Sequence, residues 1–86
     1  METLDGNAIG GLLQEVFGTE MTDAVGTCAT CGATGPVAET VVYLRVPGTV
    51  VRCRVCGSVL MVISTVRGIN CVGLEGLSAL RPRHLA

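Results

Sequence analysis

The 86-residue sequence contains no tryptophan and no lysine, and its aromatic side chains are limited to Phe17 and Tyr43. We therefore expect an aliphatic core built mainly from valine, leucine and isoleucine. Six arginines are the only strong cations and the formal net charge is −1, a poor balance for general phosphate binding. The longest apolar run, VLMVIS from Val59, is far shorter than the roughly 20 residues of a membrane-spanning helix. It suits a buried strand.

The first residues, METLDGNAIGG, lack the basic start, the apolar run and the small-residue cleavage site of a secretory signal. We therefore expect a cytoplasmic protein with no membrane association, and a single domain over residues 1–86. Five cysteines are an odd number for a disulfide framework. In a reducing cytoplasm, paired cysteines more often bind a metal.

Side chains suited to catalysis are also scarce. His84 is the single histidine and lies in the C-terminal tail, and the seven acidic residues are scattered along the chain. No phosphate-binding glycine motif and no nucleophile-base pair is recognisable. We therefore expect no enzyme activity and no small-molecule substrate.

A helix is predicted over residues 6–17, with Asp5 as its N-cap and Gly18 as its C-cap. Gly10 and Gly11 inside this helix each cost roughly 0.5 to 1 kcal/mol relative to alanine. Close packing on the chain's own sheet, or close approach of another backbone, would offset that cost. The apolar face of the helix follows the i, i+3, i+4 spacing and comprises Ala8, Ile9, Leu12, Leu13, Val16 and Phe17.

The stretch PVAETVVYLRV, residues 36–46, is rich in β-branched residues and predicts a strand. Pro47 and Gly48 supply a turn, after which TVVRC returns toward the later cysteines. A two-residue loop, with a slip of one residue as the alternative, gives one face of the hairpin two opposed pairs: Tyr43 with Arg52, and Arg45 with Val50. The other face then carries Val42, Leu44, Val46 and Val51.

A second hairpin is predicted from VLMVISTV and INCVGL, turning at Arg67 and Gly68. It places Cys71 opposite Ser64, where a free thiol behaves as a small buried apolar group, with a redox role as the alternative. Met21 and Met61 are expected to fill gaps in the core. The tail, residues 78–86, is expected to be frayed.

The cysteines show the most specific pattern: C-x2-C, 21 intervening residues, then C-x2-C. Two residues between thiolates let both sulfurs converge on one tetrahedral ion, and Gly32 and Gly57 allow the sharp turn after each pair. Two short disulfides are the competing interpretation. The predicted site is one Zn²⁺ per chain, and because four thiolates leave no open position, its role should be structural. Its ligands are Cys28, Cys31, Cys53 and Cys56.

With its two CxxCG knuckles, the hairpin between them and a further hairpin after the second, the chain resembles the zinc-ribbon family over residues 27–74. Together with the N-terminal stretch LDGNA to EVFG, it also resembles a family of small bacterial zinc-ribbon proteins with no assigned function. The resemblance implies a zinc ribbon with antiparallel hairpins, a small α+β fold. It also implies a binding module of the kind used in transcription, translation and protein assembly.

Three functions follow, in order of preference. The first is a non-catalytic adaptor that binds a protein partner or its own copy through the N-terminal helix. The second is a nucleic-acid-associated module with a stacking and phosphate-contact patch; the competing interpretation is that the arginines beside Cys53 only offset thiolate charge. The third is an electron carrier with iron in place of zinc, similar to rubredoxin, although rubredoxins are rich in aromatic residues. The patch of the second function comprises Tyr43, Arg45, Arg52 and Arg54.

Overall fold

The structure is a computed structural model and describes residues 3–45 and 48–82. These residues form a small α+β fold with an N-terminal helix and antiparallel strands, so the predicted fold class is confirmed. The elements in chain order are β1 (Thr3–Asp5), η1 (Gly6–Ile9), α1 (Gly10–Phe17), β2 (Val25–Cys28), β3 (Thr34–Pro36), η2 (Val37–Glu39), β4 (Val41–Arg45), β5 (Gly48–Arg52), β6 (Val59–Val66), β7 (Ile69–Gly73) and β8 (Leu77–Arg81).

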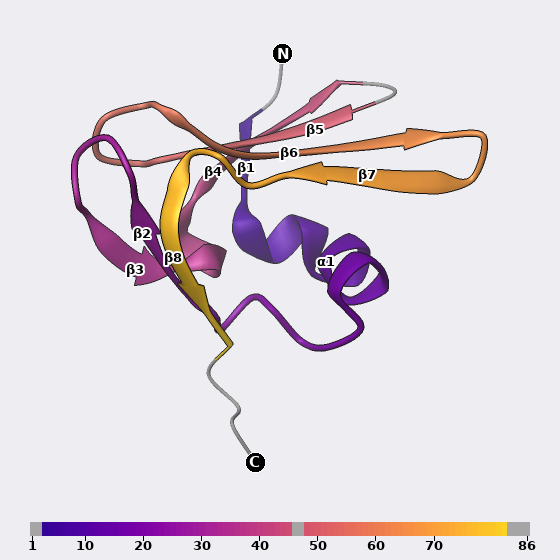
Figure 1. Ribbon diagram of the computed structural model, residues 1–86, viewed down its shortest axis with the longest axis horizontal. Helices are drawn as coiled ribbons and strands as arrows, with labels where there is room; N and C mark the ends of the chain where they lie inside the picture. Colours follow the sequence, from indigo (N-terminus) through magenta and orange to yellow (C-terminus); the bar gives the residue numbers. More distant parts are fainter. Residues whose placement is uncertain (1–2, 46–47, 83–86) are drawn as a thin grey trace.

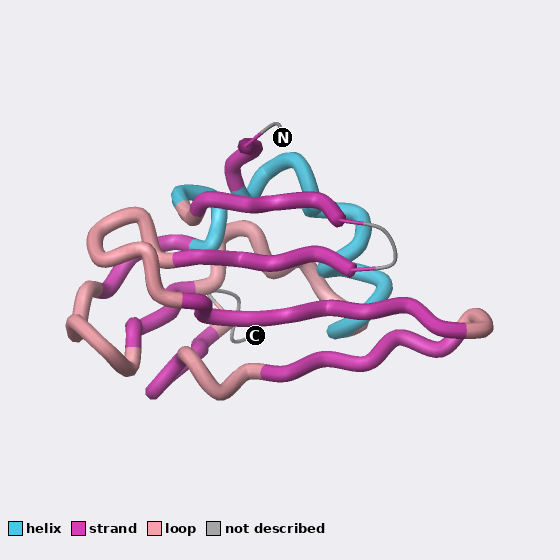
Figure 2. Tube along the Cα trace, turned by 90° about the horizontal axis from the view of Figure 1, so that it is seen from above, coloured by secondary structure: helices cyan, strands magenta, loops and turns pink. Residues whose placement is uncertain are grey.

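The strands form two sheets. One has five strands in the order β1-β4-β5-β6-β7, and the other has three in the order β3-β2-β8. The helix α1 lies against one face of the larger sheet, and the smaller sheet lies at one end of it (Figure 1). Seen from above, the strands of the larger sheet run side by side, with β1 and β7 at its two edges (Figure 2). The predicted hairpins are thus neighbours in a single sheet, joined through β5 and β6.

The N-terminal helix has the predicted extent and caps. The Asn7 backbone N–H donates a hydrogen bond of 3.1 Å to the Asp5 carboxylate, which starts a 3-10 turn that continues into α1. Gly18 ends the helix in the left-handed conformation, with φ of 75°, and its N–H donates to the Gln14 carbonyl. The predicted helix over residues 6–17 is therefore confirmed, with a tighter first turn.

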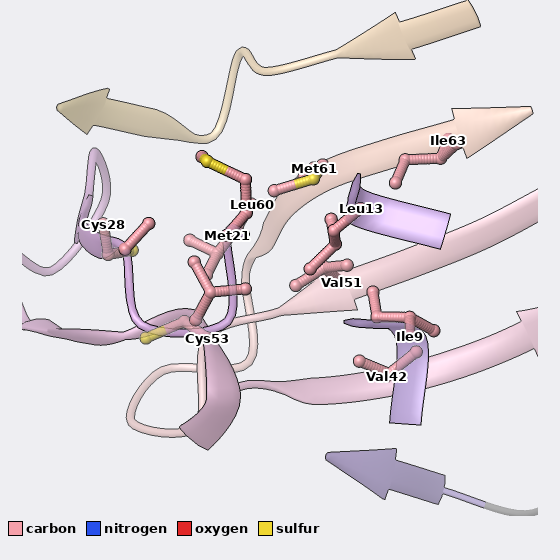
Figure 3. Packing of buried hydrophobic residues seen from close by; sticks show 12 residues of the cluster. Ile9, Leu13, Met21, Cys28, Val42, Val51, Cys53, Leu60, Met61 and Ile63 are labelled. Atoms are coloured by element: carbon pink, nitrogen blue, oxygen red, sulfur yellow. The ribbon is translucent and has the colours of Figure 1, made fainter. Parts of the chain in front are cut away.

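The helix places its apolar side chains on the chain's own sheet. Leu13 is fully buried, and in Figure 3 it lies beside Val51 and Met61. Leu12, Val16 and Phe17 are partly buried against the same core. Ala8 is exposed, so the prediction that it belongs to the buried face was wrong. The buried hydrophobic side chains are Ile9, Leu13, Met21, Ala24, Cys28, Val37, Val42, Val51, Cys53, Leu60, Met61 and Ile63.

The predicted strand over residues 36–46 is broken. The segment Val37–Glu39 forms η2, and the Thr40 N–H and hydroxyl both donate to the Val37 carbonyl, at 3.0 and 2.7 Å. Val37 itself is buried. The buried Val37 and the tight turn that it begins therefore take the place of the first half of the expected strand.

The β4–β5 hairpin differs from the predicted register by two residues. Tyr43 lies opposite Val50 and Arg52 lies opposite Val41, so the centre of the hairpin lies one residue earlier in the chain than expected. A shift of two residues preserves the faces. Tyr43 and Arg52 therefore still share one face, and the Arg52 guanidinium lies 5.5 Å from the centre of the Tyr43 ring. The predictions for Val46 and Pro47 concern positions outside the described residues.

The β6–β7 hairpin turns at the predicted residues, Arg67 and Gly68, whose φ values are 53° and 79°. Cys71 lies opposite Ser64, as predicted. Its side chain is exposed, however, so the prediction of a buried thiol was wrong. The residue lies on the outer face of the edge strand, away from α1. Met21 and Met61 are both buried and fill the core as expected.

The predicted frayed tail is wrong for residues 78–81. The strand β8 runs antiparallel to β2, with Val25 opposite Arg81 and Gly26 opposite Leu80. Leu77 and Leu80 pack against the core, and this burial holds the strand in place. Residues 83–86, with His84, lie outside the described part of the chain. In that part, no helix combines the length and apolarity needed to cross a membrane.

Replacement of Gly11 by alanine is expected to stabilise the chain by about 0.5 to 1 kcal/mol, because alanine loses less conformational freedom than glycine in a helix. A Cβ at Gly11 would meet no atom within 4 Å, whereas one at Gly10 would lie 3.2 Å from the Thr22 methyl group. Urea unfolding of Gly11→Ala, with Gly10→Ala for comparison, checks this. A destabilised Gly11→Ala would contradict the prediction and indicate that another backbone packs there.

Candidate metal centre

Two loops with the same backbone geometry hold the four predicted cysteine ligands. In the first loop, the Cys28 N–H donates to the Ala33 carbonyl and the Gly32 N–H donates to the Cys28 carbonyl, both at 2.9 Å. In the second, the corresponding bonds run from Cys53 to Ser58 at 2.8 Å and from Gly57 to Cys53 at 2.9 Å. Each loop therefore turns the chain back on itself within the C-x2-C-G motif.

The glycine after each cysteine pair is required by the backbone conformation. Gly32 has φ of 76° and Gly57 has φ of 78°, in the left-handed region that residues with a Cβ rarely adopt. These values confirm the predicted sharp turn at both glycines. The turn frees a backbone N–H for sulfur: the Val55 N–H donates to the Cys53 sulfur at 3.4 Å.

The two loops bring all four thiols together. Their sulfur atoms lie within 4.8 Å of one another, with separations of 3.7 Å between Cys28 and Cys56 and between Cys31 and Cys53. A tetrahedron with metal-sulfur bonds of about 2.3 Å has sulfur-sulfur edges of about 3.8 Å. The cluster therefore has the size of a four-thiolate metal site and could hold a metal ion.

The two loops are anchored to the core through their first cysteines. Cys28 ends β2 and Cys53 follows β5, and both side chains are buried, whereas Cys31 and Cys56 are exposed. Figure 3 shows Cys28 and Cys53 at one end of the hydrophobic cluster. None of the five cysteines of the chain forms a disulfide. The competing prediction of two short disulfides is therefore not what the structure shows.

Hydrogen bonds favour the thiolate form of two cysteines. The Ser58 hydroxyl and then the Ser58 N–H donate to Cys56, and they lower the pKa of its thiol to about 6. The Cys56 N–H, followed by the Val55 N–H, lowers the pKa of Cys53. Donors directed at sulfur stabilise a negative charge there, which is the state in which a cysteine binds a metal.

The pKa of Cys31 shows how four neighbouring thiols oppose the ionisation of one another. The Ala33 N–H lowers its pKa, but partial loss of water around the sulfur and the three neighbouring thiols together raise it more, and the pKa rises to about 12. Four negative sulfurs at these distances repel one another unless a cation lies between them. A soft divalent cation with a preference for thiolates fits both the donor set and its spacing.

The arginines near the second loop already have partners. Arg52 donates to the Gly57 carbonyl at 2.9 Å and also lies over Tyr43, while Arg54 lies 3.3 Å from the Glu39 carboxylate. Two residues of the predicted nucleic-acid patch, Tyr43 and Arg52, therefore lie together, whereas Arg54 pairs with Glu39. The side chain of Arg45 lies outside the described part of the structure.

A cleft beside the cluster was not predicted. Its volume is about 60 Å³, enough for about four water molecules or the heavy atoms of one aliphatic side chain. Arg54 and Glu39, both largely exposed, contribute to its lining. The walls come from segments far apart in the sequence, so no local pattern could have indicated it. They include Cys28, Val37, Val51, Cys53, Leu60, Met61 and Leu77.

Cys71 lies outside the cluster, on the exposed face of β7. Since four thiolates fill a tetrahedral site, Cys71→Ala is expected to keep a full equivalent of metal and to unfold within about 0.5 kcal/mol of the unaltered chain. Metal analysis and urea unfolding check this. A loss of metal in Cys71→Ala would show that the four-cysteine ligand set is wrong.

Comparison with known proteins assigns the chain to a family but assigns it no function. No curated protein and no solved structure matches the chain. Residues 1–84 match the model of a family of unknown function, DUF6510. The match covers the helix, both cysteine loops and β8, so the whole described fold falls within it. The chain therefore belongs to the family of unknown function DUF6510.

Proposed function

We propose that the protein is a non-catalytic, zinc-stabilised binding module of the zinc-ribbon type that acts as an adaptor for a protein partner or a second copy, in the cytoplasm. The observation that carries the proposal is the four-sulfur cluster, with separations of 3.7 Å and no fifth ligand among the described residues. Four thiolates complete the coordination of one Zn²⁺ and leave no position for water or substrate. Within residues 3–45 and 48–82, no second cluster of histidine, cysteine and acidic side chains accompanies it.

The metal is tested on protein purified without added metal, by elemental analysis and visible absorption. We expect one zinc per chain and no visible band, because Zn²⁺ has a filled d shell. The described part of the chain places one aromatic side chain, Phe17, against the core, unlike the aromatic surroundings of a rubredoxin iron. A stoichiometric iron content with a visible thiolate band would replace the zinc proposal with an electron carrier.

The adaptor role is supported by surfaces that the fold leaves uncovered. The cleft beside the cluster could take one aliphatic side chain, and the exposed Arg54–Glu39 ion pair contributes to its lining. The outer face of the large sheet exposes apolar side chains, among them Val66 and Ile69. The helix offers a smaller surface than its sequence suggested, since Leu12, Val16 and Phe17 pack partly against the core. Binding through the helix remains a prediction.

Tagged protein at native abundance, purified with its partners before and after nuclease treatment, tests the adaptor role. We expect a defined protein partner, or the chain itself, to remain bound after nuclease treatment. A partner set that disappears with nuclease, together with salt-sensitive binding to RNA or DNA, would favour the nucleic-acid alternative. Arg52 and Arg54 contact the Gly57 carbonyl and the Glu39 carboxylate within the chain, which leaves less of either guanidinium for a phosphate.

A further inference from the structure

We propose that the edge strand β7 pairs with β7 of a second copy of this chain, so that two five-stranded sheets continue into one around a twofold axis. The inference rests on the proposed function, since it names a partner for the module. It is tested separately, because it depends on the backbone of β7 and not on the metal. Figure 2 shows β7 at one edge of the larger sheet, and among the described residues it pairs on one side only, with β6.

The hairpin turn determines which backbone groups of β7 are free. Arg67 and Gly68 both have positive φ, at 53° and 79°, as in a type I′ turn. In such a hairpin the residues that flank the turn exchange two hydrogen bonds, and every second pair along the strands does the same. Since Ile69 lies opposite Val66, the backbones of residues 69, 71 and 73 face β6.

The intervening residues, Asn70 and Val72, therefore direct their N–H and C=O groups away from the sheet. They form an edge with two donors and two acceptors at the spacing that an antiparallel strand requires. Pairing Asn70 with Val72 of a second copy, and the reverse, uses all four groups. This register is centred on Cys71, the middle residue of β7 (Ile69–Gly73), so all five residues of each strand are paired. A centre at residue 70 or 72 pairs only residues 69–71 or 71–73.

The side chains agree with the same register. Ile69 then lies opposite Gly73 of the second copy, on the outer face of the sheet. Ile69 is 65% exposed, and a Cβ at Gly73 would meet no atom within 4 Å. Each isoleucine can therefore lie over the open glycine of the other copy, and the symmetry repeats this contact twice.

Other sheet edges are protected in ways that β7 is not. Natural edges are blocked by charge, by proline or by short length. The outer strand β1 has three residues and ends in Asp5, and β3 has three residues and ends in Pro36. The outer strand β8 has five residues and ends in the charged Arg81. The sequence of β7, INCVG, has five residues with no charge and no proline. The second copy is thus the occupant whose strand matches this edge in length, register and side chains.

Sedimentation equilibrium of the zinc-loaded protein in reducing buffer tests the proposal. We expect a reversible dimer, and at least about tenfold weaker association for Cys71→Lys, because two ammonium groups would face each other across the axis. Val66→Lys is the matched control: Val66 is 53% exposed on the same face but lies on β6. It should remain dimeric, and both variants should keep their zinc. A wild type that is monomeric at its highest soluble concentration, or equal weakening by both lysines, would overturn the proposal.

Oxidation with diamide gives a second readout that does not depend on a charged variant. In the proposed register the two Cys71 Cα atoms lie about 4.5 Å apart, within the range of a disulfide. Two S–H bonds break, one S–S bond forms, and diamide takes up both hydrogens. The wild type should give a covalent dimer through Cys71, and Cys71→Ser should not. The double variant Cys71→Ser, Ile69→Cys should also fail, because each new thiol lies opposite Gly73; rapid cross-linking by this variant would show that the register is wrong.

Discussion

Serine in place of Cys28 or Cys53 is expected to remove the bound metal and the cooperative unfolding transition together. The free energy of structural zinc binding is roughly 10 to 16 kcal/mol in small zinc domains. That exceeds or equals the roughly 5 to 15 kcal/mol by which a whole domain is usually stable. Both side chains are buried at the end of the hydrophobic core, so a lost ligand also disturbs its packing.

Metal content and urea unfolding, measured on the same samples, check this prediction. Cys71→Ser is the matched control, because it makes the same chemical change at a cysteine outside the cluster. It should retain its metal and a cooperative transition. A full equivalent of metal in both Cys28→Ser and Cys53→Ser would contradict the assignment of these ligands.

Alanine in place of Gly76 is expected to lower the free energy of unfolding by about 1 to 3 kcal/mol or more. This is the usual cost of forcing extra atoms into a packed region. A Cβ at Gly76 would collide with the Val59 carbonyl oxygen and would lie 2.6 Å from the Leu60 Cα. These are backbone atoms of β6, so no side-chain rotation can relieve the clash. The turn before β8 would have to move.

The displacement should also reach the metal site. The Gly76 carbonyl accepts a hydrogen bond of 2.9 Å from the Ala29 N–H, directly after Cys28. We therefore expect Gly76→Ala to release zinc to a chelator faster than the unaltered chain, in addition to unfolding at lower urea. Gly11→Ala, where a Cβ meets open space, is the control for the substitution itself. Unchanged stability and zinc release in Gly76→Ala would show that this turn does not support the first cysteine loop.

Features set by neighbours within a few residues could be predicted from the sequence. The capped helix, the turn at Arg67 and Gly68 and the two C-x2-C-G loops each depend on local backbone preferences, and the structure shows all three. The gathering of four thiols was also predictable, because a paired motif repeated across a hairpin leaves few arrangements other than a shared site.

Strand pairings that the local sequence does not specify could not be predicted. The sequence shows no local sign that β8 pairs with β2, because that contact joins strands far apart along the chain. The register of β4 and β5 was wrong by two residues, since a shift of two keeps every side chain on its face and leaves the hydrophobic pattern unchanged.

The exposure of Cys71 illustrates the same division. Its position in a strand opposite Ser64 followed from the sequence, because the turn was correctly placed at Arg67 and Gly68 and fixes the pairing of its two strands. Whether that strand is central or at an edge depends on how the hairpins assemble. No local sequence pattern indicates that arrangement. By itself, the sequence determined the four clustered cysteines, the turns and the helix. The tertiary structure alone decided which strand is an edge, and hence which surface another chain can reach, because sheet order is set by contacts between residues distant along the chain.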